Sequence, residues 1–409
     1  MQRNRIFFFA VFMLILTGVG LVCLGQAGVS SAQSPENRAS ALLEHWLPVA
    51  GVPPKQNPSP LNLDQMIGQM LMLGFSGTKP TDQGVIDAQN LLAKGQIGGL
   101  ILMGANLENK KQVATLLRFL SLRAPVGLPP FLAVDQEGGM VQRLRGEHGF
   151  TDVPQAGVIG ANHTHQGARK FYDTMAKELA DVGFNMNFGP VVDLNLVPSN
   201  PIIGMKGRSY GQTSKQVEQF AQSFVLAHRH HNIMTSLKHF PGHGSSWTDS
   251  HEQFVDLTKS WQAKELLPYK NLVKRNLVDM VMVGHLYHPQ FSDGDQLPAS
   301  LSRRAIDHLR GDIGFQGLVV TDDLGMGAIK KYFRFEDALI KAVHAGNDIL
   351  LLVDHKLASP EGIKRIHSII KQAVRAKKLS VQTLQKASAR VMAAKQRLLR
   401  AETAAPPQH

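Results

Sequence analysis

Residues 317–324 have the sequence GLVVTDDL, in which the apolar run 318–320 is followed by Thr321, Asp322 and Asp323. A short apolar run bounded by glycine and by carboxylates is typical of a buried strand in a parallel sheet. A carboxylate at the end of such a strand serves as a nucleophile, a metal ligand or a helix N-cap. Because neighbouring side chains on a strand point to opposite faces, we expect Asp322 to face the centre of the fold and Asp323 to cap the next helix.

Seven more short apolar runs precede and follow this one, each succeeded by polar or glycine-rich residues and then by a segment with helical spacing. The runs are residues 70–75, 97–102, 131–134, 186–192, 234–237, 280–283 and 349–353. The segments with helical spacing include residues 85–94, 111–123, 168–182, 217–231, 263–276, 302–312 and 335–344. Eight strands that alternate with helices predict an α/β fold, a single (β/α)8 TIM-type barrel, with an open doubly wound sheet as the alternative.

Polar side chains follow five of the eight predicted strands. They are Asp135, Asp193, Lys238 with His239, His285 and Asp322. In a barrel of this type the carboxyl ends of the strands converge on one face, which carries the active site. We therefore expect these side chains to gather around one cavity.

The segment that follows the fifth predicted strand has the sequence KHFPGHG at 238–244 and DSH at 249–251. Pro241 and the glycines exclude a helix, so His239 and His243 do not form a zinc pair spaced by four residues. Asp249 is close enough in sequence to orient the imidazole of His251, whose ordinary pKa of about 6.5 suits a group that donates and recovers a proton. Metal binding by the histidines of this region is the less favoured alternative, because no ligand spacing supports it.

The composition excludes several classes of protein. The chain has 409 residues, 43% of them hydrophobic and 19% charged, which is too apolar for a disordered protein and too polar for one with several membrane spans. Its 44 basic and 32 acidic residues give a formal net charge of +12, which favours polyanions in general. We expect no nucleic-acid partner, since no dense Lys/Arg block is interleaved with aromatic residues. The single cysteine, Cys23, excludes an intrachain disulfide.

The N-terminus has the features of an export signal. Two arginines precede the uncharged apolar run 6–25, and a small-residue pattern, Ser30-x-Ala32, follows it. The run is also long enough to remain as a membrane anchor, and a lipoprotein site at Cys23 is a third alternative. The protein is therefore expected to be exported, to the periplasm, the cell envelope or the medium, with contact to a membrane only through this segment if it is not cleaved. The expected organisation is a signal or anchor at 1–32, a proline-rich linker at 33–60, the barrel at 61–400 and a disordered tail at 401–409.

Several motifs occur in a specific order along the predicted barrel. They are Asp135-Gln-Glu-Gly-Gly with Arg143, Asn187-Phe-Gly-Pro-Val-Val-Asp193, Gly207-Arg208-Ser-Tyr-Gly, Lys238-His-Phe-Pro-Gly-His-Gly244, Asp249-Ser-His251, Pro298-Ala-Ser-Leu-Ser302 and Thr321-Asp322-Asp323-Leu. The set resembles the motifs of glycoside hydrolase family 3, and within it those of the β-N-acetylhexosaminidase branch. The resemblance covers residues 61–398 and is most specific over the two histidine-containing motifs.

The resemblance implies a retaining, two-step removal of terminal β-linked N-acetylglucosamine from amino-sugar oligosaccharides such as peptidoglycan fragments or chitin-type chains. Asp322 would be the nucleophile, and His251 would be the acid/base group with Asp249 as its partner. The resemblance assigns the binding of the sugar and its acetamido group to Asp135, Arg143, Arg208, Lys238 and His239. A retaining glycosidase needs a nucleophile and an acid/base group, and here a His–Asp pair replaces the second carboxylate. No metal or organic cofactor is implied, and a monomer is expected.

Three stretches depart from the family pattern. Met140 stands where the family usually has an arginine, Ser245 and Ser246 replace a more polar acidic pair, and 203–208 carries extra residues. Few residues follow the eighth strand, so the second α/β domain of larger members is expected to be missing. Two other functions stay open: a phosphorylase, because a neutral histidine repels incoming phosphate less than a carboxylate would, and a non-catalytic glycan-binding protein of the cell envelope.

Overall fold

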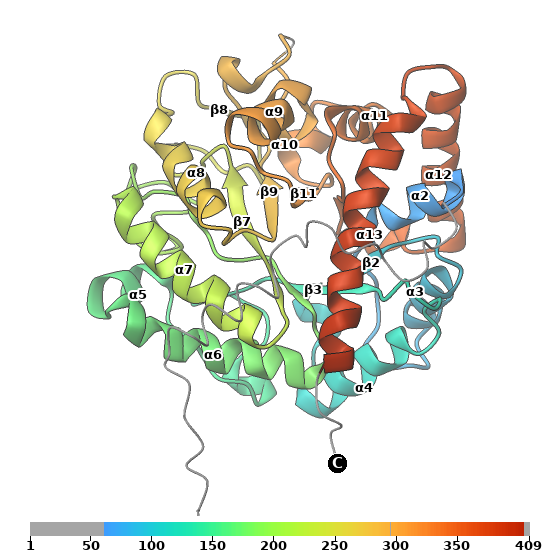
Figure 1. The fold of residues 1–409 in the computed structure, drawn as a ribbon, viewed down its shortest axis with the longest axis horizontal. Helices are drawn as coiled ribbons and strands as arrows, with labels where there is room; N and C mark the ends of the chain where they lie inside the picture. The colour runs from blue at the N-terminus through green and yellow to red at the C-terminus, as the bar shows by residue number, and fades with distance from the viewer. Residues whose placement is uncertain (1–60, 295, 405–409) are drawn as a thin grey trace, which may run out of the picture. The chain divides into compact units, whose positions relative to one another are not determined.

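A computed structural model describes residues 61–294 and 296–404, without the side chains of 401–404. The predicted export signal or anchor, the predicted linker and residues 405–409 lie outside the described residues. The described chain has an α/β fold built on eight parallel strands that follow one another around a nearly closed barrel (Figure 1). The strands are β1 (Leu71–Leu73), β2 (Gly99–Leu102), β3 (Phe131–Val134), β6 (Met186–Asn187), β7 (Met234–Phe240), β9 (Met280–Val283), β11 (Leu318–Thr321) and β12 (Leu350–Leu352).

The barrel closes between β11 and β12, which share fewer paired residues than the other neighbouring strands. A single parallel bridge joins Val320 to Ile349. Two side chains extend this seam. They accept hydrogen bonds from backbone N–H groups in β12 and just after it. The Oγ1 of Thr321 accepts from the N–H of Leu351 (3.0 Å), and the Oδ1 of Asp323 accepts from that of Val353 (3.0 Å). We expected Asp323 to cap the following helix. Its side chain instead helps to close the barrel.

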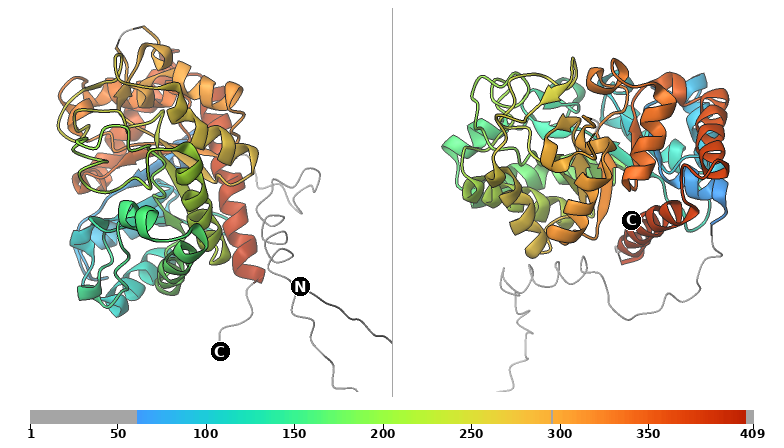
Figure 2. Two further views of the ribbon diagram at one scale, coloured as in Figure 1. Left: turned by 90° about the vertical axis from the view of Figure 1, so that its left-hand side faces the viewer. Right: turned by 90° about the horizontal axis from the view of Figure 1, so that it is seen from above.

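Helices separate the strands and cover the outside of the barrel (Figures 1 and 2). They are α2 (Leu63–Gln69), α3 (Gln83–Ala93), α4 (Lys110–Ser121), α5 (Ala156–Asn162), α6 (His165–Val182), α7 (Ser214–His230), α8 (Leu267–Lys274), α9 (Arg303–Asp307), α10 (Gly327–Lys330), α11 (Phe335–Ala345), α12 (Pro360–Arg375) and α13 (Val381–Ala404). The short pairs β4 (Gln136–Gly138) with β5 (Val141–Gln142) and β8 (Val255–Asp256) with β10 (Leu286–Tyr287) lie outside the barrel sheet. The predicted alternation of strands and helices is confirmed, and the doubly wound alternative is wrong.

Two predicted elements are shorter than the sequence pattern suggested. The fourth barrel strand, expected at 186–192, ends at Asn187, and only Val191 makes a further bridge. Pro190 has no N–H group to donate to a neighbouring strand, which accounts for the interruption. The helix expected at 302–312 divides into α9 and a π-helical turn at His308–Asp312.

Alternate side chains of the strands pack into two separate apolar layers. On β1, Leu71 and Leu73 join the layer beneath the outer helices, while Met72 joins the layer inside the barrel. The same alternation holds on β11, where Val319 is outside and Leu318 and Val320 are inside. The strands are therefore buried on both faces, which explains why they appear in the sequence as continuous apolar runs.

The last helix, α13, closes one end of the barrel interior. It lies in front of the strands in Figure 1, and its Val391 and Ala394 pack against the inner apolar layer. The buried Lys395 donates to the carbonyl of Gly98 just before β2 (2.8 Å), and burial lowers the pKa of this amine to about 7. The open cavity of the barrel is consequently at the other end, where the strands finish. Among residues 61–294 and 296–404, no helix combines the length and the apolar character needed to cross a bilayer.

Candidate active site

A cavity of about 370 Å³ opens where the barrel strands end. Seven of the eight site residues expected from the sequence line it, and the eighth, Asp249, is bonded to one of them. The seven are Asp135, Arg143, Arg208, Lys238, His239, His251 and Asp322. The strand-end residues Asp135, Lys238, His239 and Asp322 thus converge on one cavity as predicted, whereas Asp193 and His285 do not line it.

Asp322 follows β11 directly and continues the inward alternation of Leu318 and Val320. Its N–H donates to the carbonyl of Val283 on β9 (2.9 Å), and its Oδ1 accepts from the N–H of Asp323 (2.9 Å). Burial alone would raise the pKa of Asp322, but nearby imidazoles and this N–H hold the pKa below its ordinary value. The carboxylate is therefore ionised at neutral pH and faces the cavity, as a nucleophile requires.

His285 fixes the backbone next to Asp322. Its Nε2 lies 2.8 Å from the carbonyl of Asp323, and its Nδ1 lies 2.7 Å from the Oγ of Ser300. Because burial lowers the pKa of His285, the ring is neutral, donating from Nε2 and accepting at Nδ1. The sequence marked this residue as a strand-end group, and the structure shows it to be a positioning residue for the Asp322–Asp323 segment.

Asp249 and His251 form a bonded pair on the loop after β7. The Oδ1 of Asp249 accepts from the N–H of His251 (2.8 Å) and lies 2.7 Å from its Nδ1. Burial raises the pKa of Asp249, but the two bonds from His251 and the charge of Lys206 together lower it by more. The pKa is therefore below its ordinary value. The His251 side chain is 56% exposed, which leaves its Nε2 free to meet a ligand in the cavity.

The backbone of this loop is fixed against the segment that follows Asp322. The N–H of Gly327 donates to the carbonyl of His251 (2.9 Å), and that of Ala328 donates to the carbonyl of Ser250 (3.1 Å). A Cβ at position 327 would lie 2.5 Å from two loop carbonyl oxygens, so this close approach requires glycine. The imidazole of His243, which burial keeps neutral by lowering its pKa to about 4, lies 3.1 Å from the Oγ of Ser250.

Two buried cations of the cavity wall, Lys238 and Arg208, are held by the carboxylates of Asp135 and Glu137. The Nζ of Lys238 lies 2.8 Å from Asp135 and 2.6 Å from Glu137. Arg208 donates two parallel bonds to Glu137, from Nε to Oε2 (2.9 Å) and from Nη2 to Oε1 (2.8 Å). Burial raises the pKa of Glu137, but the two cations outweigh it and hold the pKa well below its usual range. These bonds fix both cations at the cavity wall.

Glu137 was not among the site residues expected from the sequence. Its signal in the sequence was its position two residues after Asp135, although Glu137 itself does not line the cavity and reaches it only through its bonds to Lys238 and Arg208. Arg143 approaches Asp135 at 3.6 Å from the short β4–β5 hairpin. The expected pairing of an acid and a base at this strand end is therefore present.

His239 is held by a fully buried carboxylate. Its Nδ1 lies 2.7 Å from Asp193 Oδ2, and the same carboxylate accepts from the N–H of His243 (2.8 Å). The peptide bond between Lys238 and His239 is cis, and both side chains line the cavity. Burial raises the pKa of Asp193, but His239 and the bond from His243 lower it overall. Asp193, a predicted strand-end residue, acts from behind the cavity wall.

The start of the loop that carries His251 is hydrogen-bonded to a side chain of η3 (Ala263–Leu266). The carboxyl group of Glu265 accepts from the N–H of Gly244 (3.1 Å) and from the Oγ of Ser245 (2.7 Å). The indole N–H of Trp261 donates to the carbonyl of Pro241 (3.1 Å). Burial raises the pKa of Glu265 to about 7. These bonds hold the start of the loop in place, while Trp247 nearer its tip is 68% exposed.

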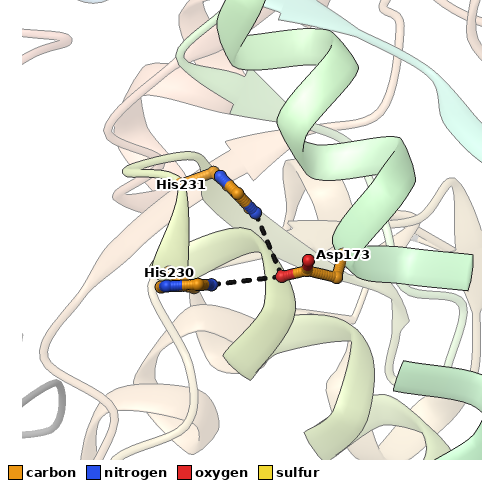
Figure 3. A group of neighbouring side chains, drawn as sticks. All are labelled: Asp173, His230 and His231. Carbon is orange, nitrogen blue, oxygen red and sulfur yellow. Dashed lines mark hydrogen bonds and ion pairs between the residues drawn. The ribbon is translucent and has the colours of Figure 1, made fainter. Parts of the chain in front are cut away.

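The histidine cluster at the end of α7 lies apart from the cavity. Among the residues that the structure describes, Asp173, His230 and His231 are the one group whose metal-ligating atoms all lie within 4.8 Å (Figure 3). His230 Nδ1 lies 3.1 Å and His231 Nε2 lies 3.0 Å from the Oδ1 of Asp173. The neighbouring His228 is buried, and burial lowers its pKa to about 3, so its imidazole is neutral.

Comparison with known proteins places this chain in a family. The family model described as "Glycosyl hydrolase family 3 N terminal domain" matches residues 62–394. The chain belongs to glycoside hydrolase family 3. The resemblance inferred from the motifs is confirmed.

Relatives in family 3 carry the name β-hexosaminidase. The chain is 33% identical to β-hexosaminidase A of Pseudoalteromonas piscicida, over 83% of this chain and 62% of that protein. It is 30% identical to β-hexosaminidase LpqI of Mycobacterium tuberculosis, over 91% of this chain and 93% of that protein. The family 3 chain thus spans less than two thirds of the first relative and nearly all of the second.

Solved structures of family 3 share the barrel. The family 3 β-N-acetylglucosaminidase from Paenibacillus sp. str. FPU-7 matches with a TM-score of 0.76 and 34% identity, covering 85% of this chain and 65% of that one. The β-N-acetylhexosaminidase from Beutenbergia cavernae DSM 12333 matches with a TM-score of 0.74 and 28% identity, covering 83% of this chain and all of that one.

Proposed function

We propose that this chain is a retaining exo-β-N-acetylglucosaminidase in which Asp322 is the nucleophile and His251, paired with Asp249, is the acid/base group. The observation that carries the proposal is the placement of an ionised carboxylate and a carboxylate-bound imidazole on one cavity. The names of the relatives support the amino-sugar substrate class. The buried charged wall supports a tightly held terminal sugar.

The proposed first step is an in-line displacement at the anomeric carbon. The Asp322 carboxylate forms a bond to this carbon while the bond to the leaving-group oxygen breaks. Protonated His251 transfers its Nε2 proton to that oxygen, and Asp249 stabilises the imidazolium through Nδ1. The products are the released alcohol and a glycosyl ester on Asp322.

The second step hydrolyses the ester. Neutral His251 takes a proton from water, whose oxygen attacks the anomeric carbon as the bond to Asp322 breaks. The carboxylate and the imidazolium are restored together. Two displacements at one carbon give net retention of the β configuration.

The wall of Asp135, Arg143, Arg208, Lys238 and His239 would hold the sugar through these steps. Cations that are already fixed by Glu137 and Asp135 lose little freedom when they donate to sugar oxygens. A rigid wall positions the anomeric carbon relative to Asp322. This is the part of the site in which the described side chains make the most bonds to one another.

The test is hydrolysis of a chromogenic β-N-acetylglucosaminide by the purified protein and by Asp322→Asn. We expect turnover by the wild type, a loss of roughly 10⁴-fold or more in the variant, and retained thermal stability. Wild-type-like turnover by Asp322→Asn would overturn the assignment of the nucleophile. Release of sugar 1-phosphate that depends on added phosphate would favour the phosphorylase instead.

We also propose that the protein is exported by its first 32 residues, which precede a linker at 33–60 and a catalytic barrel at 61–400. The support is the sequence pattern of basic residues, apolar run and small residues. Peptidoglycan fragments or chitin-type oligosaccharides would then be the available substrates. Cell fractionation of the wild type and of a variant with two charges placed in run 6–25 tests this, and retention of both proteins in the cytoplasm would overturn it.

A further inference from the structure

Three side chains that can ligate a metal meet between α6 and α7 (Figure 3). Asp173 lies in α6, His230 is the last residue of α7, and His231 is the cap residue that follows it. The Nδ1 of His230 and the Nε2 of His231 both face the Oδ1 of Asp173. None of these three residues lines the catalytic cavity, and β7 begins just after them at Met234. The group therefore lies near the start of a barrel strand, away from the strand ends that form the cavity.

The two helices that carry these side chains are held against each other. The Oγ of Ser223 in α7 donates to the carbonyl of His165 at the start of α6 (2.7 Å). The ring of Tyr172, the residue before Asp173, packs on that of Phe224 in α7, with the two centroids 4.9 Å apart. The backbone beneath the three side chains is thus positioned by contacts that do not involve them.

The distances within the group suit a metal ion. In a tetrahedral zinc site with bonds of about 2.0–2.2 Å, neighbouring ligand atoms lie about 3.3–3.5 Å apart. The two nitrogen–oxygen distances, 3.1 and 3.0 Å, are slightly shorter than this, and all three ligand atoms lie within 4.8 Å of one another. The His231 side chain is 19% exposed and is held in place, whereas that of His230 is 54% exposed and is free to turn toward an ion.

The chemistry of the three ligands selects a class of ion. Burial raises the pKa of Asp173, but the bonds from the two imidazoles lower it by more, so the carboxylate is ionised. An ionised carboxylate and neutral imidazoles are the forms that ligate a metal. Imidazole nitrogens suit Zn²⁺, Ni²⁺ and Cu²⁺, whereas Ca²⁺ and Mg²⁺ take oxygen ligands. Two nitrogens with one oxygen therefore favour a divalent transition-metal ion.

We propose that Asp173, His230 and His231 bind a divalent transition-metal ion such as Zn²⁺, and that this ion ties the end of α7 to α6. The inference is independent of the proposed function, because the site shares no residue with the catalytic cavity. Water would complete the coordination, since the side chains of Asp173 and His230 are 45% and 54% exposed. An ion that binds this arrangement of two helices, and not the unfolded chain, stabilises the folded protein.

The experiment is a calorimetric titration of the purified protein, without a histidine tag, with zinc chloride. We expect the wild type to bind one Zn²⁺ at this site at least about tenfold more tightly than Asp173→Asn, His230→Gln or His231→Gln. Zn²⁺ at about a hundred times the dissociation constant should raise the Tm of the wild type by about 4 °C, and the rise should disappear in the three variants. Ca²⁺ at the same concentration should leave the Tm unchanged.

Two further variants locate the ion. His355→Gln removes an exposed histidine of η7 (His355–Leu357), and His251→Ala removes the imidazole of the catalytic cavity. Both should keep the affinity and the rise in Tm of the wild type. Absence of binding by the wild type, equal binding by the three ligand variants, or loss of this binding in His251→Ala would overturn the proposal. Melting of each variant in the presence of EDTA shows that it is folded, so that lost binding is distinguished from lost structure.

Discussion

At the cavity wall, Arg208 and Lys238 bond to the carboxylates of Asp135 and Glu137, largely out of contact with water. On the loop after β7, His251 and Asp249 form a pair, and the imidazole is more than half exposed. Bonds within the protein fix the charges of the wall, whereas the imidazole of the loop is open to solvent. In the mechanism proposed above, the wall holds the sugar, and the imidazole changes its protonation state twice per turnover and activates water.

Among variants that compare the wall with the loop, the largest effect is expected from removing the accessible imidazole. We expect His251→Ala to lower kcat/KM by roughly 10²–10⁴ for a substrate with an alcohol leaving group, and much less for one with a nitrophenol leaving group that needs no proton. The free energy of unfolding should hardly change, because the side chain is exposed.

Steady-state kinetics on the two substrates and thermal melting check this prediction. Glu252→Ala, which removes the exposed neighbouring side chain, is the matched control. Equal losses on both substrates would mean that His251 positions the sugar instead of transferring a proton, and the contrast between wall and loop would then fail.

The next largest effect comes from the wall. Glu137→Gln leaves the buried cations Arg208 and Lys238 without their shared carboxylate, so we expect the free energy of unfolding to fall by about 3–5 kcal/mol. Urea denaturation measures it. Glu147→Gln, at an exposed position of the same strand-loop region, should change it by less than about 0.5 kcal/mol. A wall variant as stable as this control would show that the network does not hold this side of the cavity together.

The smallest effect concerns the base of the loop. Burial raises the pKa of Glu265 to about 7, so between its unfolded pKa of about 4.5 and pH 7 the native state binds more protons than the unfolded state. The free energy of unfolding should therefore fall by about 1–3 kcal/mol as the pH rises through this window. Denaturation at several pH values measures the slope, which Glu265→Gln should flatten. An unchanged slope in the variant would assign the pH dependence to other groups.

Much of the fold and the placement of the candidate reacting groups follow from local sequence. Buried strands appear as apolar runs, and polar residues at their ends, such as Asp135 and Asp322, continue an alternation that is visible without a structure. The Asp249–His251 pair is equally local, since the two residues are two positions apart. These predictions needed only strand geometry and spacing.

What could not be predicted depends on segments far apart in the chain. Glu137 matters because Arg208 and Lys238, 71 and 101 positions later, meet it in the barrel. The role of Asp323 depends on Val353, which follows the last strand.

The seam between β11 and β12 determines how a mutational scan of this enzyme should be interpreted. Thr321 and Asp323 supply acceptors that join the last strand to its neighbour, and Asp322 between them faces the cavity. Under the proposed mechanism, substitution at any of these three consecutive positions would abolish turnover, two of them by loosening the barrel and one by removing the nucleophilic oxygen. Activity alone would therefore assign a three-residue catalytic motif, whereas protease resistance of each variant would separate the one chemical residue from its two structural neighbours.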